Sequence, residues 1–311
     1  MNGVINIERE KQEKQKKKIV IIYHHDVDGL ASSALVVRAL GRSVEAFSHD
    51  PNEEFPMIEA DEVFIVDIAI TEKTWGSVQN IRSSKITWVD HHRPFAELSY
   101  LKFPANVQIV LDPSSPSAVK LVQKYFSLND EVSQKITDLG TKADMWQITP
   151  FVQDWMNLDT AYSYYQKDKT ILIEALSRGD FEISGERLEV LNAYLQEKEK
   201  AIKELLQNTF VKEVKGHLVA VGLAPGILSG SESADIVLKA TNSEIQIILK
   251  TQGWMSFRRA KTSSVNLLAL AKIWNGGGHE YASGAELGKT VSEENFSAVA
   301  SEIFEKISQV L

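Results

Sequence analysis

The sequence predicts an α/β protein: an N-terminal, mostly parallel sheet flanked by helices, a long linker helix and a smaller C-terminal α/β domain. Two observations predict this class. In the first half of the chain, short apolar runs alternate with helical patterns, as in βαβ units. A charged helical pattern over 186–207 is then followed by a second series of strand and helix patterns. At 311 residues the chain is long enough for two domains of ordinary size.

Four strands are predicted in the first half of the chain. Ile19–Tyr23 is a continuous apolar run, which is typical of a strand buried on both faces of a parallel sheet. Three similar runs follow, with helical patterns between and after them. The last pattern, 146–165, is rich in Trp and Tyr, which we expect mainly in the core. The predicted strands are 19–23, 63–66, 86–89 and 107–111, and the predicted helices are 30–40, 71–81, 117–126, 131–143 and 146–165.

The long charged pattern over 186–207 is interpreted as a connector between domains. Beyond it, strands are predicted at 217–222, 244–250 and 254–258, and helices at 263–274 and 292–310. The predicted domains are a charged N-terminal tail (1–18), a first domain (19–184), a linker helix (185–208) and a second domain (209–311).

The composition is that of a soluble globular protein, with 43% hydrophobic and 24% charged residues. No apolar run approaches the ~20 residues that a membrane helix needs, and we expect neither a secretion signal nor membrane association. Cysteine is absent, so disulfides and thiolate metal sites are excluded, and a reducing cytoplasm is the expected location. The net charge of −8 favours small or short substrates over long duplex DNA.

Acidic residues stand at the ends of three predicted strands. The first strand leads into the segment 24–29, the second ends at Asp67, and the third ends at Asp90. Ligands bind beyond the carboxyl ends of the strands in open parallel sheets, so one edge of the sheet would collect these groups. If the chain stays extended through 24–28, alternate side chains point to the same side, and Gly29 allows the turn into the helix. Four of the seven histidines lie in two of these segments: His24, His25, His91 and His92.

Bound divalent metal ions would explain this concentration of carboxylates. Without cations, converging carboxylates repel one another and resist ionisation. Carboxylate and imidazole ligands without sulfur favour Mn²⁺, with Mg²⁺, Co²⁺ or Zn²⁺ as alternatives. The ligands outnumber the needs of a single ion, so we expect two ions that share a bridging carboxylate.

At this point the motifs resemble those of the DHH phosphoesterase family, which is named for the motif at residues 90–92. The family includes RecJ-like exonucleases, nanoRNases, cyclic-dinucleotide phosphodiesterases and inorganic pyrophosphatases. The resemblance covers nearly the whole chain and is specific as a set, whereas a single Asp-His-His would be weak. The matching motifs occur in the family's order: His24-x-Asp26-x-Asp28-Gly29, Val66-Asp67, Asp90-His91-His92 and Ala143-Asp144.

The second half of the chain agrees with this resemblance. It is similar to the DHH-associated substrate-binding domain, which carries a Ser-x-Arg strand and a Gly-Gly-Gly-His loop. This likeness argues against the pyrophosphatase branch, whose second domain is of a different type. The segments that carry it are Ser256-Phe257-Arg258, Asn275-Gly276-Gly277-Gly278-His279 and Ala282-Ser283-Gly284.

The resemblance implies a role for each motif residue. Asp67 bridges the two metal ions, and His92 faces the substrate phosphate, so these two are the expected catalytic residues. His25 matches no ligand position and is interpreted as a packing or supporting residue. The implied ligands are His24, Asp26 and Asp67 for one ion, and Asp28, Asp67, His91 and Asp144 for the other.

In the second domain, the resemblance implies that Arg258, the glycines 276–278 and His279 bind substrate across an interdomain cleft. Glycines let backbone N–H groups approach a phosphate closely, and an arginine can hold a phosphate through two hydrogen bonds. Ser117 stands where the helix 117–126 is predicted to begin. Its side chain either caps that helix, which is the favoured role, or contacts substrate.

The expected function is that of a two-metal phosphodiesterase which hydrolyses short oligonucleotides to nucleoside 5′-monophosphates, as nanoRNases do. By resemblance, a histidine at position 24 is commoner in the branches that act on short substrates. The expected partner is short single-stranded RNA or DNA, or a nucleotide. A homodimer is the favoured oligomeric state.

Three alternatives stay open. A RecJ-like single-strand exonuclease is disfavoured by chain length, because those proteins usually carry extra nucleic-acid-binding domains. A cyclic-dinucleotide phosphodiesterase or a phosphoadenosine phosphate phosphatase fits the motifs equally well. A catalytically dead nucleotide-binding protein is disfavoured, because every expected acidic ligand is present.

Overall fold

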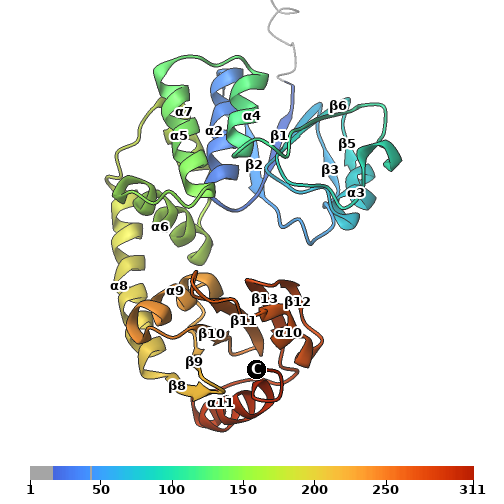
Figure 1. Cartoon of the computed structure of the whole chain (residues 1–311). Coiled ribbons are helices and arrows are strands. Elements are labelled where there is room, and N and C mark those ends of the chain that lie inside the picture. The colour runs from blue at the N-terminus through green and yellow to red at the C-terminus, as the bar shows by residue number, and fades with distance from the viewer. Residues whose placement is uncertain (1–16, 43) are drawn as a thin grey trace, which may run out of the picture. The chain divides into compact units, whose positions relative to one another are not determined.

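The computed structural model describes residues 17–42 and 44–311 (Figure 1). The chain divides into two compact units, the first ending at Leu191 and the second beginning at Asn192. The predicted N-terminal tail, 1–18, lies outside the described residues except for Lys17 and Lys18. Among the described residues, no helix combines the length and the apolar character needed to cross a membrane.

The first unit is built on a five-stranded sheet in which every neighbouring pair is parallel. Its strands, in sheet order, are β2 (Glu45–Ser48), β1 (Ile19–Tyr23), β4 (Glu62–Val66), β6 (Lys85–Asp90) and β7 (Val107–Leu111). Two short strands, β3 (Ile58–Glu59) and β5 (Ile81–Arg82), form a second parallel pair. The α/β fold class and the four predicted strands are confirmed. The edge strand β2 was not predicted, because it is short and no residue in it is fully buried.

Helices α2, α4, α5 and α7 lie together beside this sheet (Figure 1). The predicted helix 71–81 is in fact the short α3 followed by a 3-10 turn, and α7 was not predicted. Trp155 and Tyr162 of α6 are fully buried, as expected for core aromatic residues. The helices of this unit are α2 (Val27–Leu40), α3 (Glu72–Ser77), α4 (Ala118–Tyr125), α5 (Glu131–Asp144), α6 (Pro150–Tyr164) and α7 (Thr170–Arg178), with 3-10 turns at Val78–Asn80 and Leu98–Tyr100.

The expectation of an extended chain through 24–28 is wrong. Helix α2 already begins at Val27, and Asp26 is its N-cap, accepting the backbone N–H of Gly29 at 3.0 Å. Asp28 therefore lies in the first turn of a helix and does not alternate with Asp26 along a strand. Gly29 is needed for a close approach rather than for a turn, because a Cβ there would lie 2.1 Å from the carbonyl oxygen of His24.

The second unit contains a six-stranded sheet in which β9 and β10 are parallel and the other neighbours are antiparallel. Helix α8 has the predicted bounds, Glu186–Gln207, and crosses the division between the units. In sheet order the strands are β12 (Gly277–His279), β13 (Ala282–Glu286), β11 (Trp254–Arg259), β10 (Ile245–Leu249), β9 (His217–Leu223) and β8 (Thr209–Val214). The other helices are α9 (Gly230–Thr241), α10 (Leu267–Ala271), a 3-10 turn at Lys272–Trp274, and α11 (Glu293–Ile307).

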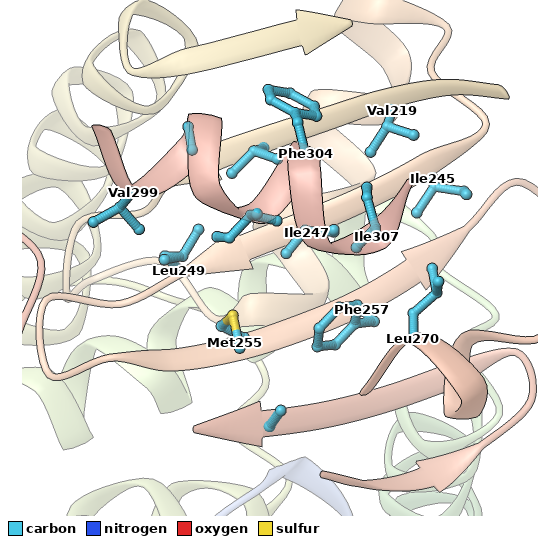
Figure 2. Packing of buried hydrophobic residues seen from close by; sticks show 14 of the residues in the cluster. Val219, Ile245, Ile247, Leu249, Met255, Phe257, Leu270, Val299, Phe304 and Ile307 are labelled. Carbon is cyan, nitrogen blue, oxygen red and sulfur yellow. The ribbon is translucent and has the colours of Figure 1, made fainter. Parts of the chain in front are cut away.

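One face of this second sheet is buried beneath α11. Figure 2 shows Phe304 and Ile307 of α11 together with Ile247 and Phe257 of the central strands, all within one apolar cluster. The opposite face packs against residues of α8 and α9, including Leu205 and Val237. Arg258 follows Phe257, so the alternation along β11 directs its side chain to the α9 face.

Several details of the second unit differ from the sequence prediction, which did not include β8, α9 or β13. The predicted helix 263–274 is reduced to α10 and one 3-10 turn. The glycine segment after it is not simply a loop, since Gly277–His279 forms the edge strand β12 and pairs antiparallel with β13. Glycine-rich sequence gives little indication of a strand, because it lacks the side chains that pack on a pleated surface.

Candidate metal centre

Three neighbouring strands bring the motif residues to one edge of the first sheet. His24 follows β1, Asp67 follows β4, and His91 follows the last residue of β6. Two further carboxylates come from helices: Asp28 from the first turn of α2 and Asp144 from the last residue of α5. All of these belong to the first unit.

Asp67 is buried between imidazole rings. It is 2% exposed, and neither of its carboxylate oxygens has a hydrogen-bond partner in the described part of the chain. Its oxygens lie 3.7 Å from Nδ1 of His24, 3.6 Å from Nε2 of His91 and 3.9 Å from Nδ1 of His92. A buried carboxylate without a partner is energetically costly, and a bound cation at this position would remove that cost.

The backbone of Asp67 adopts the left-handed conformation, with φ 58°. Outside glycine, this conformation is tolerated best by Asp and Asn. The backbone N–H of Asp67 still donates to the carbonyl of Val89, at 3.0 Å, so the residue stays attached to β6. The turn of the chain therefore directs the carboxylate away from the regular strand path.

The motif residues form three groups in which one potential ligand atom from each residue lies within 4.8 Å of the others. The group of His24, Asp26 and Asp67 is the set expected for one ion. The group of Asp28, His91 and Asp144 contains three of the four residues expected for the other ion. The third group contains His92, whose Nδ1 already lies 2.8 Å from Oδ1 of Asp90. The groups are His24, Asp26 and Asp67; Asp28, His91 and Asp144; and Asp67, His91 and His92.

The residues present fit divalent metal ions. The donor atoms are carboxylate oxygens and imidazole nitrogens, which suit Mn²⁺ or Mg²⁺. Within residues 17–42 and 44–311, Nε2 of His91 is buried without a hydrogen-bond partner, as are both oxygens of Asp67. Nδ1 of His91 lies 3.3 Å from the carbonyl oxygen of Ser115. A hydrogen bond from Nδ1 leaves Nε2 as the free lone pair, which is the arrangement of a metal-ligating histidine.

Asp28 is held by the amino end of another helix. Its two oxygens accept the backbone N–H groups of Ala118, at 2.6 Å, and Val119, at 2.9 Å, at the start of α4. The predicted capping by Ser117 is therefore wrong: its side chain makes no capping hydrogen bond and instead pairs with the Thr141 hydroxyl at 2.7 Å. Ser117 is also fully buried, so the structure gives no support to the alternative of substrate contact.

Electrostatics in this cluster disfavour ionisation of most of its carboxyls. Burial, followed by the charge of Asp26, raises the pKa of Asp28 to about 8. Burial, followed by the charge of Asp28, raises the pKa of Asp67, and burial also raises the pKa of Asp144. For Asp26, burial is again the largest single effect and acts in the same direction, but several interactions, led by the hydrogen bond with His24, together outweigh it and lower the pKa. Divalent cations would favour ionisation of all four groups.

The second unit places the other predicted residues on its sheet. The guanidinium of Arg258 donates to the Ser231 hydroxyl of α9 at 2.8 Å and to the carbonyl of Phe257 at 2.9 Å. Arg258 pairs with Ala282, and Ala282 pairs with His279, so the three stand in one row across β11, β13 and β12. Residues opposite each other in neighbouring strands project to the same face, so Arg258 and His279 share a face of the sheet.

The three predicted glycines differ in their surroundings. A Cβ on Gly276 would lie 2.3 Å from the carbonyl oxygen of Gly284, and one on Gly278 would lie 2.7 Å from the carbonyl oxygen of Ala282. A Cβ on Gly277 would meet nothing within 4 Å. Packing of the β12–β13 hairpin thus accounts for two of the glycines, and Gly277 is the one with open space beside it.

Sequence reasoning missed two features beside the metal centre. Lys169 and Asp159 form a buried ion pair at 2.6 Å, and the Lys169 ammonium also donates to the carbonyl of His25 at 3.1 Å. No sequence pattern marks this pair, because the two residues lie in different elements. The second feature is Trp146, which was expected in the core but is 67% exposed.

Comparisons with known proteins agree with the motifs. Residues 18–143 match the DHH family, N-terminal domain. A search of the curated proteins finds no match. Among solved structures, the chain is similar to the pGpG-specific phosphodiesterase PggH from Vibrio cholerae, with a TM-score of 0.61 and 15% identity over 94% of this chain and 99% of that one.

Two further structures share the fold. RecJ from Thermus thermophilus, in complex with Mn²⁺, gives a TM-score of 0.55 and 18% identity over 98% of this chain, which spans 54% of the length of that RecJ. An exopolyphosphatase-related protein from Bacteroides fragilis gives a TM-score of 0.52 and 17% identity over 100% of this chain and 99% of that one. The enzyme class expected from the motifs, a hydrolase acting on phosphoester bonds, agrees with the family match. The family likeness thus rests on residues 18–143, which match the DHH family, N-terminal domain.

Proposed function

We propose that the protein is a two-metal phosphodiesterase that hydrolyses short oligonucleotides to nucleoside 5′-monophosphates. The observation that carries the proposal is Asp67, a buried carboxylate without a hydrogen-bond partner among the described residues, whose oxygens lie within 4 Å of His24, His91 and His92. Ligand groups on both sides of Asp67 support its role as the bridge between two ions, with Mn²⁺ as the preferred metal and Mg²⁺ or Co²⁺ as alternatives.

In this proposal the ions are held by His24, Asp26, Asp28, Asp67, His91 and Asp144. Bound divalent ions would supply a water molecule whose pKa is lowered from about 15.7 towards 7, so that hydroxide is available at neutral pH. Asp28 is held by α4 and His91 by the carbonyl of Ser115, so these two ligand candidates are positioned before any ion binds.

His92 is proposed to stabilise the phosphoryl group. Its hydrogen bond with Asp90 raises the pKa of the imidazole, so the ring tends to carry a positive charge. Nδ1 is committed to Asp90, which leaves Nε2 as the donor for a phosphoryl oxygen. A positive donor at this position would offset negative charge as it develops in the transition state.

In the second unit, Arg258, the glycines 276–278 and His279 are proposed to bind a substrate phosphate or nucleotide. Arg258 and His279 stand in one row of the sheet, and Gly277 has free space beside it. A guanidinium beside an exposed glycine backbone is a suitable environment for an anion. The division into a catalytic domain, linker helix and substrate-binding domain belongs to this proposal, whereas a cytoplasmic location and a homodimer stay predictions.

A preference for short substrates over long single strands is favoured by the net charge of −8 and by the histidine at position 24. The test is hydrolysis, with added Mn²⁺, of 5′-labelled RNA and DNA of two to about twenty nucleotides, cyclic di-AMP and 3′-phosphoadenosine 5′-phosphate. We expect the shortest oligomers to have the highest kcat/KM. Preference for long single strands would favour the RecJ-like alternative, and preference for the two small nucleotides would favour the cyclic-dinucleotide or phosphatase alternatives.

Asp67→Ala is the matched variant for this assay. It should abolish hydrolysis of every substrate in the panel and lower the Mn²⁺ content of the purified protein. Retained turnover with two ions bound would contradict the assignment of Asp67. Failure of the wild-type protein to hydrolyse any of these substrates with any divalent metal would favour a non-catalytic nucleotide-binding protein.

A further inference from the structure

An exposed apolar segment follows the ligand candidate Asp144. Trp146 is 67% exposed and Met145 50% exposed, and Phe151 lies partly exposed at the start of α6. Trp155 and Tyr162, the other aromatic residues of this region discussed above, are fully buried. Burial of a tryptophan side chain is strongly favourable, so its exposure beside a candidate catalytic centre calls for a functional explanation.

The backbone conformation at Trp146 indicates that a tryptophan at this position does not stabilise the fold. Helix α5 ends in a Schellman motif, in which the N–H of Trp146 bonds to Ala143 at 3.1 Å and the N–H of Gln147 bonds to Lys142 at 2.8 Å. Trp146 occupies the left-handed position of this motif, with φ 56°. Glycine is the usual residue there, because a side chain makes the conformation costly. The sequence therefore retains an indole at a site where a smaller residue would suit the fold better.

The indole lines a cavity that also contains metal-ligand candidates. This cavity has a volume of about 220 Å³ and lies entirely within the first unit. Its walls include the carboxylate-bearing residues Asp28 and Asp144, and also Trp146 and Met156. Pockets for drug-sized ligands usually measure about 300–1,000 Å³, so this one suits a single ring system. An acidic, metal-binding part and an aromatic part in one small cavity match the phosphate and base of a nucleotide.

We propose that Trp146 is a stacking platform for one nucleobase of the substrate. The inference rests on the proposed function, because the phosphate of that nucleotide would lie at the metal ligands. Stacking on an aromatic face is available to every base, so it gives affinity with little sequence preference. Trp146 thus distinguishes nucleotide substrates from phosphoesters that lack a base.

The test compares two substrates and four proteins. The substrates are a dinucleotide and the same dinucleotide with its bases removed, and the proteins are wild type, Trp146→Gly, Trp146→Phe and Trp254→Ala. Trp254 is the matched control, because it is 59% exposed but lies on β11 of the second unit. Glycine fits the left-handed backbone at position 146, so the melting temperature of Trp146→Gly should be equal to or above that of wild type.

The expected result is a loss that depends on the base. Trp146→Gly should lower kcat/KM for the normal dinucleotide by about 5- to 150-fold, mainly through KM, the range that corresponds to loss of one base–aromatic stack. Its effect on the abasic substrate should be less than about twofold, since no stack is present to lose. Trp146→Phe should lie between wild type and Trp146→Gly, and Trp254→Ala should behave as wild type. Binding of a nucleoside 5′-monophosphate, measured by equilibrium dialysis, should weaken in parallel.

Two results would overturn the inference while leaving the proposed function intact. In one, Trp146→Gly lowers hydrolysis of both substrates equally, which would mean that the indole supports the metal centre or the fold. In the other, Trp146→Gly is as active as wild type on the dinucleotide. If the wild-type protein hydrolyses neither substrate, the proposed function itself fails.

Discussion

The carboxylate of Asp28 accepts the backbone N–H of Ala118 at 2.6 Å, although the two residues are 90 positions apart. The oxygen that accepts this N–H at the amino end of α4 also lies 3.9 Å from Nε2 of His91. The partial positive charge of the helix end favours the ionised carboxylate and opposes the effect of its burial. Helix α4 thus positions a metal-ligand candidate without contributing a side chain.

Asp28→Asn tests this arrangement. An asparagine offers one oxygen, and its NH2 group would face a backbone N–H that needs an acceptor. We expect the Mn²⁺ stoichiometry, measured by isothermal titration calorimetry, to fall from two ions to about one, because only the group around Asp28 is damaged. Asp154→Asn, on the exposed side of α6, is the control and should bind both ions. Full binding of two ions by Asp28→Asn would remove Asp28 from the ligand set.

The metal-free protein should lose stability as the pH rises. The pKa of Asp28 is raised from 3.8 to about 8 in the folded chain, so folding favours the protonated form. The stabilisation is complete below the unfolded-state pKa and is lost as the pH rises through the folded-state value. In the presence of chelator, the melting temperature should therefore decline between about pH 4 and pH 8, and saturating Mn²⁺ should reduce the decline. A metal-free melting temperature that increases over this range would contradict the burial of unpaired carboxyls.

Arg258→Ala should weaken substrate binding without affecting the metals. Loss of a hydrogen bond to a charged group corresponds to about a 10- to 100-fold rise in KM. The Mn²⁺ content should equal that of wild type, because Arg258 lies in the second unit and the ligand candidates lie in the first. Lys261→Ala, which removes an exposed charge nearby in sequence, is the control. A loss of metal from Arg258→Ala would show that the residue acts in a different site.

Two neighbouring glycines give opposite predictions. Gly276→Ala should lower the free energy of unfolding by roughly 1–3 kcal/mol, because its Cβ would overlap the Gly284 carbonyl oxygen. Gly277→Ala should be as stable as wild type, since nothing lies within 4 Å of the added Cβ. If the backbone here binds phosphate, Gly277→Ala should nevertheless raise KM. Denaturant unfolding and initial-rate kinetics on both variants separate the two effects.

Much of the fold of the first unit can be predicted from the sequence, since buried parallel strands appear as continuous apolar runs. Three of the strands that escape prediction have weak patterns: β2 and β8 are mostly exposed edges, and β12 is glycine-rich. Helix α7 lacks a start signal, because Lys169 at its N-cap makes no side-chain capping bond. Helix α9 was also not predicted, although its sequence contains a start signal, because the Ser229 side chain caps the helix.

The motif residues of the candidate site could be identified from sequence, but part of their geometry could not. The spacing suggested that Asp28 continues a strand. In the structure Asp26 is the N-cap of α2, so Asp28 already lies in the first turn of that helix. The bond between Asp28 and α4 depends on tertiary structure, as does the Asp159–Lys169 pair. The exposure of Trp146 could not be anticipated either, because an aromatic-rich helical segment is usually a core segment.

The left-handed backbone at Asp67 has an evolutionary consequence. Asparagine tolerates this conformation as well as aspartate does, and it has the same shape. A single nucleotide change in an aspartate codon produces asparagine, which would remove the negative charge that is proposed to bridge two ions while the surrounding chain stays in place. On the proposed function, a folded but inactive descendant that still binds nucleotides would therefore be one mutation away from this protein.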